Sequence, residues 1–153
     1  MNLRRAILSD VEEMMALINH FADQGLMLPR SRNSLYECLR EFLVVEDEGR
    51  VVATGALHII WDDLSEIRAL AVMEEYQGKG LGRSLVKALI DDAQTIGCPK
   101  VFTLTYQPVF FERCGFAMID KEDMPHKVWK ECIHCVKFPN CDENAMMLNL
   151  TKQ

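Results

Sequence analysis

The most informative stretch of this sequence reads Gln77-Gly78-Lys79-Gly80-Leu81-Gly82-Arg83. Its glycines let backbone N–H groups approach a ligand closely, and a helix that starts here would add the positive end of its dipole. Together these features suit a phosphate or pyrophosphate group. A glycine-rich turn is also common where it merely caps a helix, so the turn by itself does not separate the two uses.

Two other phosphate-binding patterns can be tested by their spacing. The chain lacks the P-loop pattern G-x-x-x-x-G-K-[ST]. It also lacks G-x-G-x-x-G followed by an acidic residue about 20 positions later. What remains is the pattern Q-x-x-G-x-G, to which Lys79 and Arg83 add positive charge.

The segments on either side of this loop have different periodicities. Residues 66–72 are largely apolar in their second half and predict a central strand. After the loop, apolar residues recur at helical spacing, and Gly97 marks the end of that pattern. Residues 101–106 then predict another buried strand. We therefore expect the loop to join the end of a central strand to an amphipathic helix.

The rest of the chain predicts further helices and strands. Capping boxes at Ser9 and Ser34 indicate the starts of two helices, the first broken at Gly25 and the second running to about Phe42. The other expected elements are a strand over 2–8, a hairpin of 43–46 and 51–60, a short helix over 109–114, and strands over 116–119 and 145–150. The pattern indicates one α+β domain over residues 1–153, with a mostly antiparallel sheet.

The composition excludes several classes of function. The chain has 153 residues, with 17 Lys and Arg against 23 Asp and Glu, for a net charge of −6. This acidic balance disfavours a general nucleic-acid binder, which needs clustered basic residues. The apolar runs are shorter than the roughly 20 residues that span a bilayer, and the first residues do not read as a signal peptide. We expect a cytoplasmic protein with reduced thiols and with no membrane or nucleic-acid partner.

The chain resembles the GNAT superfamily of acyl-CoA-dependent N-acetyltransferases in the order of its segments as well as in the loop. The segments that carry the resemblance are Leu70-Ala71-Val72, the loop 77–82, Val101-Phe102-Thr103-Leu104-Thr105, Phe110-Phe111-Glu112-Arg113-Cys114-Gly115-Phe116 and Ala145-Met146-Met147-Leu148. The resemblance implies a mixed, mostly antiparallel sheet of about seven strands flanked by helices, with a splayed central strand pair. It also implies acetyl-CoA as co-substrate and no required metal.

Within this superfamily, the chain is similar to the short N-acetylglutamate synthases of arginine biosynthesis. The segments behind this narrower resemblance are Leu28-Pro29-Arg30-Ser31, Ser65-Glu66-Ile67-Arg68-Ala69-Leu70-Ala71-Val72 and Phe102-Thr103-Leu104-Thr105. Longer enzymes of this class carry an amino-acid-kinase-like domain, for which 153 residues leave no room. The resemblance implies acetylation of the α-amine of L-glutamate and admits a homodimer. Another small amine, a peptide N-terminus, or a non-catalytic role as an acetyl-CoA sensor stay open.

The resemblance also implies roles for particular residues. Leu70, Ala71 and Val72, with the loop from Gln77 to Arg83, would hold the cofactor. Glu66 would be the base that helps the acceptor ammonium lose its proton, and the backbone N–H near Leu70 would stabilise the oxyanion. Strand alternation predicts that Glu66, Arg68, Leu70 and Val72 share one face. The alternative for Glu66 is a solvated glutamate that pairs with Arg68.

The proton donor to the CoA thiolate does not follow directly from the resemblance. Many relatives have a tyrosine at the position of Phe111, and phenylalanine has no proton to donate. We assign this role to Tyr106, at the end of the strand over residues 101–106. Solvent and Cys114 are the alternatives.

An acceptor with two carboxylates requires cations, and arginine is preferred because its planar fork matches a carboxylate. Arg68 is the first candidate, since a charge in an otherwise apolar strand needs a partner. Arg30 and Lys127 follow, on segments that we expect to border the cleft. Each of these two residues could equally be an ordinary surface cation.

The cysteines and histidines carry less information. Cys132, Cys135 and Cys141 lie close together in the sequence, but one C-x-x-C with one further cysteine is half of a zinc signature. A metal site, a redox-sensitive pair and reduced thiols that pack in the interior therefore stay open, and we assign no metal ligand. His20 and His58 have no sequence neighbours that would make them ligands or bases.

Overall fold

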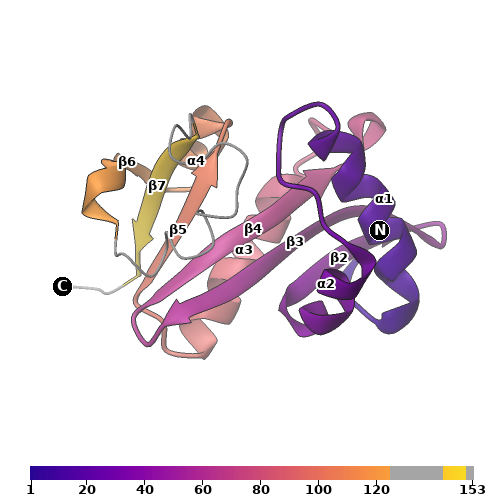
Figure 1. Cartoon of the computed structure of the whole chain (residues 1–153), viewed down its shortest axis with the longest axis horizontal. Helices are drawn as coiled ribbons and strands as arrows, with labels where there is room; N and C mark the ends of the chain where they lie inside the picture. The colour runs from indigo at the N-terminus through magenta and orange to yellow at the C-terminus, as the bar shows by residue number, and fades with distance from the viewer. Residues whose placement is uncertain (125–142, 151–153) are drawn as a thin grey trace.

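The computed structural model describes residues 1–124 and 143–150. Within them, one sheet of seven strands has the order β1-β2-β3-β4-β5-β7-β6. Its strands are β1 (Asn2–Arg5), β2 (Phe42–Asp47), β3 (Arg50–Trp61), β4 (Leu64–Val72), β5 (Lys100–Thr105), β6 (Ala117–Ile119) and β7 (Asn144–Asn149). Every neighbouring pair is antiparallel except β4 and β5, which are parallel. The expected α+β class with a mixed, mostly antiparallel sheet is confirmed (Figure 1).

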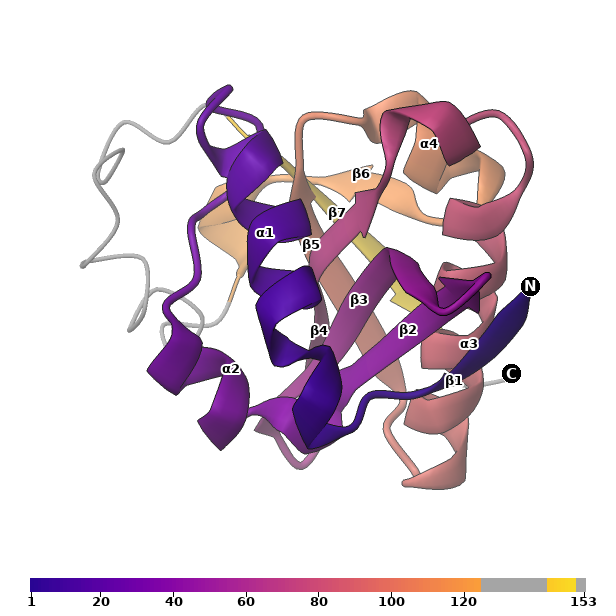
Figure 2. The same ribbon diagram turned by 90° about the vertical axis from the view of Figure 1, so that its right-hand side faces the viewer.

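Helices cover both faces of this sheet. The helices are α1 (Val11–Ala22), α2 (Arg32–Glu37), α3 (Leu81–Thr95) and α4 (Pro108–Arg113). Figure 2 shows α1 and α2 on one side of the central strands and α3 on the other. Across the part of the chain that the structure describes, no helix combines the length and the apolar composition needed to cross a membrane.

The core has two main apolar layers, one on each face of the sheet. On the α3 face, Leu85 and Leu89 pack with Val52 and Ile67. On the α1 face, Met14 and Ile18 pack against a second set of strand residues that includes Val44, Ala56 and Ala71. The central strands β3 and β4 are therefore buried on both sides, which explains their nearly continuous apolar sequence.

Strand β4 contains a β-bulge at Ala69. Thr54 pairs with Ala71 and Ala56 pairs with Arg68, so Ala69 and Leu70 together lie opposite Gly55. Ala69 has a φ of 53°, a conformation that costs a non-glycine residue about 1–2 kcal/mol. A Cβ atom on Gly55 would lie 3.0 Å from Leu70 Cδ1, so any larger residue opposite the bulge would crowd the Leu70 side chain.

The bulge corrects one expectation about β4. Glu66 and Arg68 lie on the face opposite Ile67, which packs in the α3 layer. Beyond the bulge, Leu70 and Val72 pack against that same α3 layer. The prediction that all four side chains share one face is therefore wrong, because the extra residue at the bulge reverses the alternation.

Strands β4 and β5 diverge soon after they meet. Ser65 pairs with Val101 and Glu66 with Phe102, and the Thr103 hydroxyl then donates to the Ile67 carbonyl at 3.1 Å. Beyond this point β5 instead continues its pairing with β7, as far as Thr105. The splayed central strand pair that the family resemblance implies is thus confirmed.

Both predicted helix caps are displaced by one to three residues. Helix α1 begins after Asp10, whose carboxylate accepts a hydrogen bond from the Ile7 N–H at 2.8 Å, so Ser9 is not the cap. Helix α2 begins after Ser31, whose hydroxyl oxygen accepts from the Ser34 N–H. Nearby serines and aspartates compete for a cap, and tertiary contacts decide between them.

The Asp10 carboxylate also joins the chain start to the sheet. Arg4 donates to its two oxygens at 2.8 and 3.0 Å and to Glu46 at 2.8 Å. Burial by itself would raise the pKa of the Asp10 carboxyl, but the hydrogen bonds from Arg4 and from the Ile7 N–H outweigh it and hold the pKa below its ordinary value.

We expect Asp10→Asn to lower the free energy of unfolding by about 2 kcal/mol at pH 7, because Arg4 loses a charged partner. Since the folded-state pKa of Asp10 is depressed, this stabilisation is fully present above the unfolded pKa of about 3.9 and disappears as the pH falls through the folded value. Urea unfolding at pH 7 and at about pH 3 measures the difference. Asp62→Asn, at an exposed turn, is the control. An equal difference at both pH values would contradict this assignment.

Candidate active site

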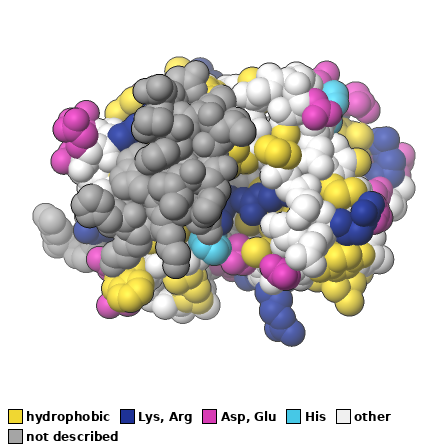
Figure 3. Space-filling model, viewed as in Figure 1, with side chains coloured by type: hydrophobic (Ala, Val, Ile, Leu, Met, Phe, Trp, Pro, Cys, Tyr) yellow, Lys and Arg dark blue, Asp and Glu magenta, His cyan; other side chains and the backbone are white. Residues whose placement is uncertain are grey.

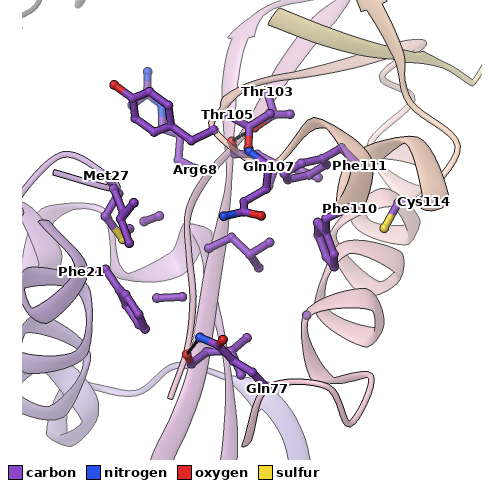
Figure 4. Close-up of a pocket in the computed structure, with 18 of the residues that line it drawn as sticks. Phe21, Met27, Arg68, Gln77, Thr103, Thr105, Gln107, Phe110, Phe111 and Cys114 are labelled. Atoms are coloured by element: carbon purple, nitrogen blue, oxygen red, sulfur yellow. Dashed lines mark hydrogen bonds between the residues drawn. The ribbon is translucent and has the colours of Figure 1, made fainter. Parts of the chain in front are cut away.

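A cavity of about 1110 Å³ opens where β4 and β5 diverge. Its walls come from the end of α1 and the segment after it, from β4, from the glycine loop, and from the end of β5 with α4. Figure 4 shows Phe21 and Met27 on one side, Phe110 and Phe111 on the other, and Gln77 and Arg68 at its two ends. Most of the family-implied cofactor segment and two of the candidate substrate cations, Arg30 and Arg68, thus share one cavity.

The glycine loop has the backbone that its sequence predicts. Gly78 and Gly80 have φ values of 77° and 84°, and Gly80 is the N-cap of α3. No atom lies within 4 Å of where a Cβ would stand on either residue. At Gly82, in contrast, a Cβ would lie 3.2 Å from the Phe110 ring. The first two glycines therefore supply backbone freedom and open space, and the third allows α4 to pack close to α3.

Gln77 anchors the loop to the end of β4. Its side-chain amide donates to the Val72 carbonyl at 3.0 Å. The Met73 N–H donates to the Val52 carbonyl on β3, so the polar groups of Val72 point away from β3. The splay therefore turns main-chain hydrogen-bonding groups of β4 toward the cavity.

Basic side chains collect at the loop end of the cavity. Arg83 lines it, and beyond Gly80 a second cavity of about 380 Å³ is bordered by Arg83, Lys87 and Arg113. Lys79 does not line either one, and its ammonium lies 5.1 Å from the centre of the Tyr76 ring. Lys87 was missed in the sequence, although it follows Arg83 at a spacing of four on one helix face.

Glu66 and Arg68 form an ion pair at the other end. The Arg68 Nε donates to Glu66 Oε1 at 2.6 Å. The Arg68 side chain is 11% exposed and the Glu66 side chain is 13% exposed. Both residues line the cavity. The pairing named above as the alternative for Glu66 is therefore present, but at a largely buried position inside the cavity.

Arg30 also borders this end of the cavity. The Asn19 side chain holds its backbone, accepting from the Arg30 N–H at 2.9 Å and donating to its carbonyl at 3.1 Å. Burial raises the pKa of the nearby Cys38 thiol, with Glu41 adding to the effect, and the charges of Arg30 and Arg68 oppose it. Both arginines therefore lie close enough to Cys38 to act on it. Lys127 falls outside the described residues.

The candidate proton donors lie on the β5 and α4 side. Tyr106 lines the cavity. Phe111 is 4% exposed and packs edge-to-face on Phe110 and Phe116, with ring centres 5.1 and 5.3 Å apart. Burial raises the pKa of the Cys114 thiol, while the charge of Arg83 opposes this shift. Of these three residues, Tyr106 is the one that has a phenolic proton to donate.

Several cavity residues were not predicted from the sequence. The apolar ones include Phe21, Met27 and Phe110, and the polar ones include Thr103, Thr105 and Gln107. Phe21 falls in the helix that the sequence predicts after Ser9, and Thr103 and Thr105 fall in the buried strand that it predicts over residues 101–106. Only the divergence of β5 from β4 places them beside a cavity.

Basic side chains outnumber acidic ones in the described lining of the cavity, whereas acidic side chains outnumber basic ones in the whole chain. Its described lining includes four arginines (Arg30, Arg68, Arg83, Arg113) and three glutamates (Glu66, Glu74, Glu143). Figure 3 shows Lys and Arg side chains gathered near the middle of the face seen in Figure 1, among apolar side chains. In residues 1–124 and 143–150, no cluster of three His, Cys, Asp or Glu side chains is arranged to hold a metal. Cys132, Cys135 and Cys141 lie outside these residues.

Known proteins share this architecture. The acetyltransferase (GNAT) family profile matches residues 9–116. The amino-acid acetyltransferase of Mycobacterium tuberculosis is 37% identical over 132 residues, which cover 84% of this chain and 75% of that protein.

Two solved structures have closely similar folds. Rv2747 from Mycobacterium tuberculosis in complex with CoA and NLQ superposes with a TM-score of 0.87 and 32% identity, covering 99% of this chain and 100% of that one. N-acetylglutamate synthase from Neisseria gonorrhoeae, complexed with coenzyme A and N-acetyl-glutamate, has a TM-score of 0.89 and 27% identity. That match covers 99% of this chain and 35% of the Neisseria chain. With the loop, the bulge and the splayed strands in place, the chain belongs to the GNAT family of acetyltransferases.

Proposed function

We propose that this chain transfers the acetyl group of acetyl-CoA to the α-amine of L-glutamate. The observation that carries the proposal is the layout of the cavity, with the glycine loop at one end and Arg68, paired with Glu66, at the other (Figure 4). The names of the relatives support an amino-acid acceptor, and the Neisseria structure supports glutamate. Arg30 and Arg68, at the end of the cavity away from the glycine loop, favour an anionic acceptor over a polyamine, which would require acidic residues.

The loop end fits the cofactor. CoA carries several negative phosphate charges, and the N–H groups of the loop with Arg83, Lys87 and Arg113 offer positive potential where Gly78 and Gly80 leave open space. The main-chain groups of Leu70, Ala71 and Val72 are assigned to the amide-bearing arm of the cofactor, as an added strand would be. Acetyl-CoA itself supplies a thioester that an amine can attack.

At the other end, Arg30 and Arg68 are assigned to the acceptor carboxylates. A planar guanidinium binds a carboxylate with two parallel hydrogen bonds, which also orients the amine. Glu66 then accepts the proton that the ammonium must lose before attack. The Leu70 N–H stabilises the negative charge that develops on the thioester oxygen, an effect typically worth about 3 kcal/mol in the barrier. Tyr106 is assigned as donor to the leaving thiolate.

A panel of free amino acids tests the acceptor by CoA release. We expect L-glutamate to have the highest kcat/KM, above L-glutamine, L-aspartate and a polyamine, because two carboxylates can use two cations. Arg30→Gln should raise the KM for glutamate about tenfold and have a smaller effect on an amino acid with a neutral side chain. Arg32→Gln is the matched control, because Arg32 is exposed and pairs with Glu12. A faster reaction with a polyamine or a neutral amino acid would overturn the glutamate assignment.

We expect Glu66→Gln to lower kcat about 100-fold near neutral pH and to leave the KM for acetyl-CoA unchanged. Glutamine can still accept the hydrogen bond from Arg68 but cannot accept a proton. The loss should shrink at high pH, where more of the acceptor amine is already neutral. The pH dependence of kcat measures this, with Glu75→Gln at an exposed position as the control. A variant with the wild-type pH profile would remove Glu66 as the base.

Gly80→Ala tests the assigned role of the loop. Because φ at Gly80 is 84°, alanine should destabilise the fold by about 1 kcal/mol and tilt the N–H groups that face the phosphates. We expect the KM for acetyl-CoA to rise about tenfold while the KM for the acceptor changes little. Gly49→Ala, at another positive φ in the turn between β2 and β3 and away from the cavity lining, is the control. Equal KM values for acetyl-CoA in the two variants would contradict the assignment.

A further inference from the structure

His58 is the direct neighbour of Glu66 across two paired strands. It lies on β3 opposite Glu66 on β4, two residue pairs from the Ala56–Arg68 pair that borders the bulge. Directly opposed residues of an antiparallel pair project to the same face, with Cβ atoms about 5 Å apart. The histidine that seems isolated in the sequence therefore stands beside the proposed base.

Glu41 fixes the orientation of this histidine. The His58 Nδ1 lies 2.9 Å from Glu41 Oε2, and the two side chains are 24% and 28% exposed. A carboxylate accepts hydrogen bonds and does not donate them, so Nδ1 carries a proton in this pair. The nitrogen that can gain or lose a proton is then Nε2. Both side chains are partly accessible to water, unlike Glu66 at 13%.

The charged groups near His58 include residues from two elements of the described chain. Glu41 belongs to the turn Leu39–Glu41 before β2, and Glu66 and Arg68 belong to β4. Glu41 and Arg68 both act on the Cys38 thiol, which places them in one neighbourhood. Glu41 thus contacts His58 from one side, and Glu66 lies opposite it on the neighbouring strand.

The proton that Glu66 takes from the acceptor needs a route out of the cavity. Glu66 is largely buried and bound to Arg68, so a proton that it takes from the acceptor must leave before the next cycle. A carboxylate stabilised by arginine also holds a proton weakly. A neighbouring imidazole with its own carboxylate partner and access to water is suited to receive that proton.

We propose that His58, oriented by Glu41, relays the proton from Glu66 to solvent. The ammonium N–H bond breaks and the proton passes to the Glu66 carboxylate, then to His58 Nε2 directly or through one water, and finally to bulk water. The carboxylate and the neutral imidazole are regenerated, and no other reactant is needed. His58 acts here through Glu66 and is a positioning and relay residue. The proposal rests on the role of Glu66 proposed above.

His58→Gln is the main test, because glutamine can still donate to Glu41 but cannot titrate. We expect kcat to fall about tenfold, the pH profile of kcat to change on its acidic limb, and the KM for acetyl-CoA to stay the same. In His58→Ala, added imidazole should restore part of kcat. The matched control is His20→Gln, since His20 also pairs with a glutamate at 2.8 Å but is 55% exposed.

Glu41→Gln provides a second variant in case the His58 variants fold poorly. It keeps His58 and should lower kcat by a smaller factor than His58→Gln, because the imidazole loses the carboxylate that orients it. Wild-type kcat and pH profile in His58→Gln, or no response of His58→Ala to imidazole, would overturn the relay. Parallel measurement of Glu66→Gln separates the two proposals. If Glu66→Gln loses activity and His58→Gln does not, only the relay fails, whereas an active Glu66→Gln refutes the base itself.

Discussion

The site depends on one backbone constraint, the left-handed conformation of Ala69 inside β4. This residue adds one position to the strand opposite Gly55, and the pairing with β5 is limited to the residues before it. A regular β4 would hydrogen-bond to β5 along its whole length, and no main-chain groups would face a ligand. The contacts of β4 with β3 and with α3 on the far side hold the strain in place, which is the usual situation for a strained residue at a functional site.

The same bulge distributes the side chains of β4 between two tasks. Before it, Glu66 and Arg68 point to the α1 face and form the charged end of the cavity. After it, Leu70 and Val72 pack with α3, and so anchor the strand end that leads into the glycine loop. Because of this one extra residue, the charged side chains before the bulge line the cavity, and the apolar side chains after it pack against α3 beside the glycine loop.

The net charge of −6 acquires meaning from this layout. An acidic chain that binds CoA phosphates, and on our proposal a dicarboxylate, must concentrate its cations near one cavity. The structure places Arg83, Lys87 and Arg113 at one end and Arg30 with Arg68 toward the other. Several of its acidic residues elsewhere form ion pairs, such as Asp10 with Arg4 and Glu12 with Arg32. Local charge, and not the total, therefore favours anionic ligands here.

The sequence by itself determined the fold class, the glycine loop and the order of the elements, because glycine spacing and apolar periodicity are local properties of the chain. It also led to the family, and through it to the splayed strands. It did not place the helix caps, the faces of β4, or the neighbours of His58. Those depend on register: a bulge reverses alternation, and residues 58 and 66 become partners only when β3 and β4 pair. Tertiary structure alone decided which buried strand positions face a cavity, since that follows from where β5 leaves β4.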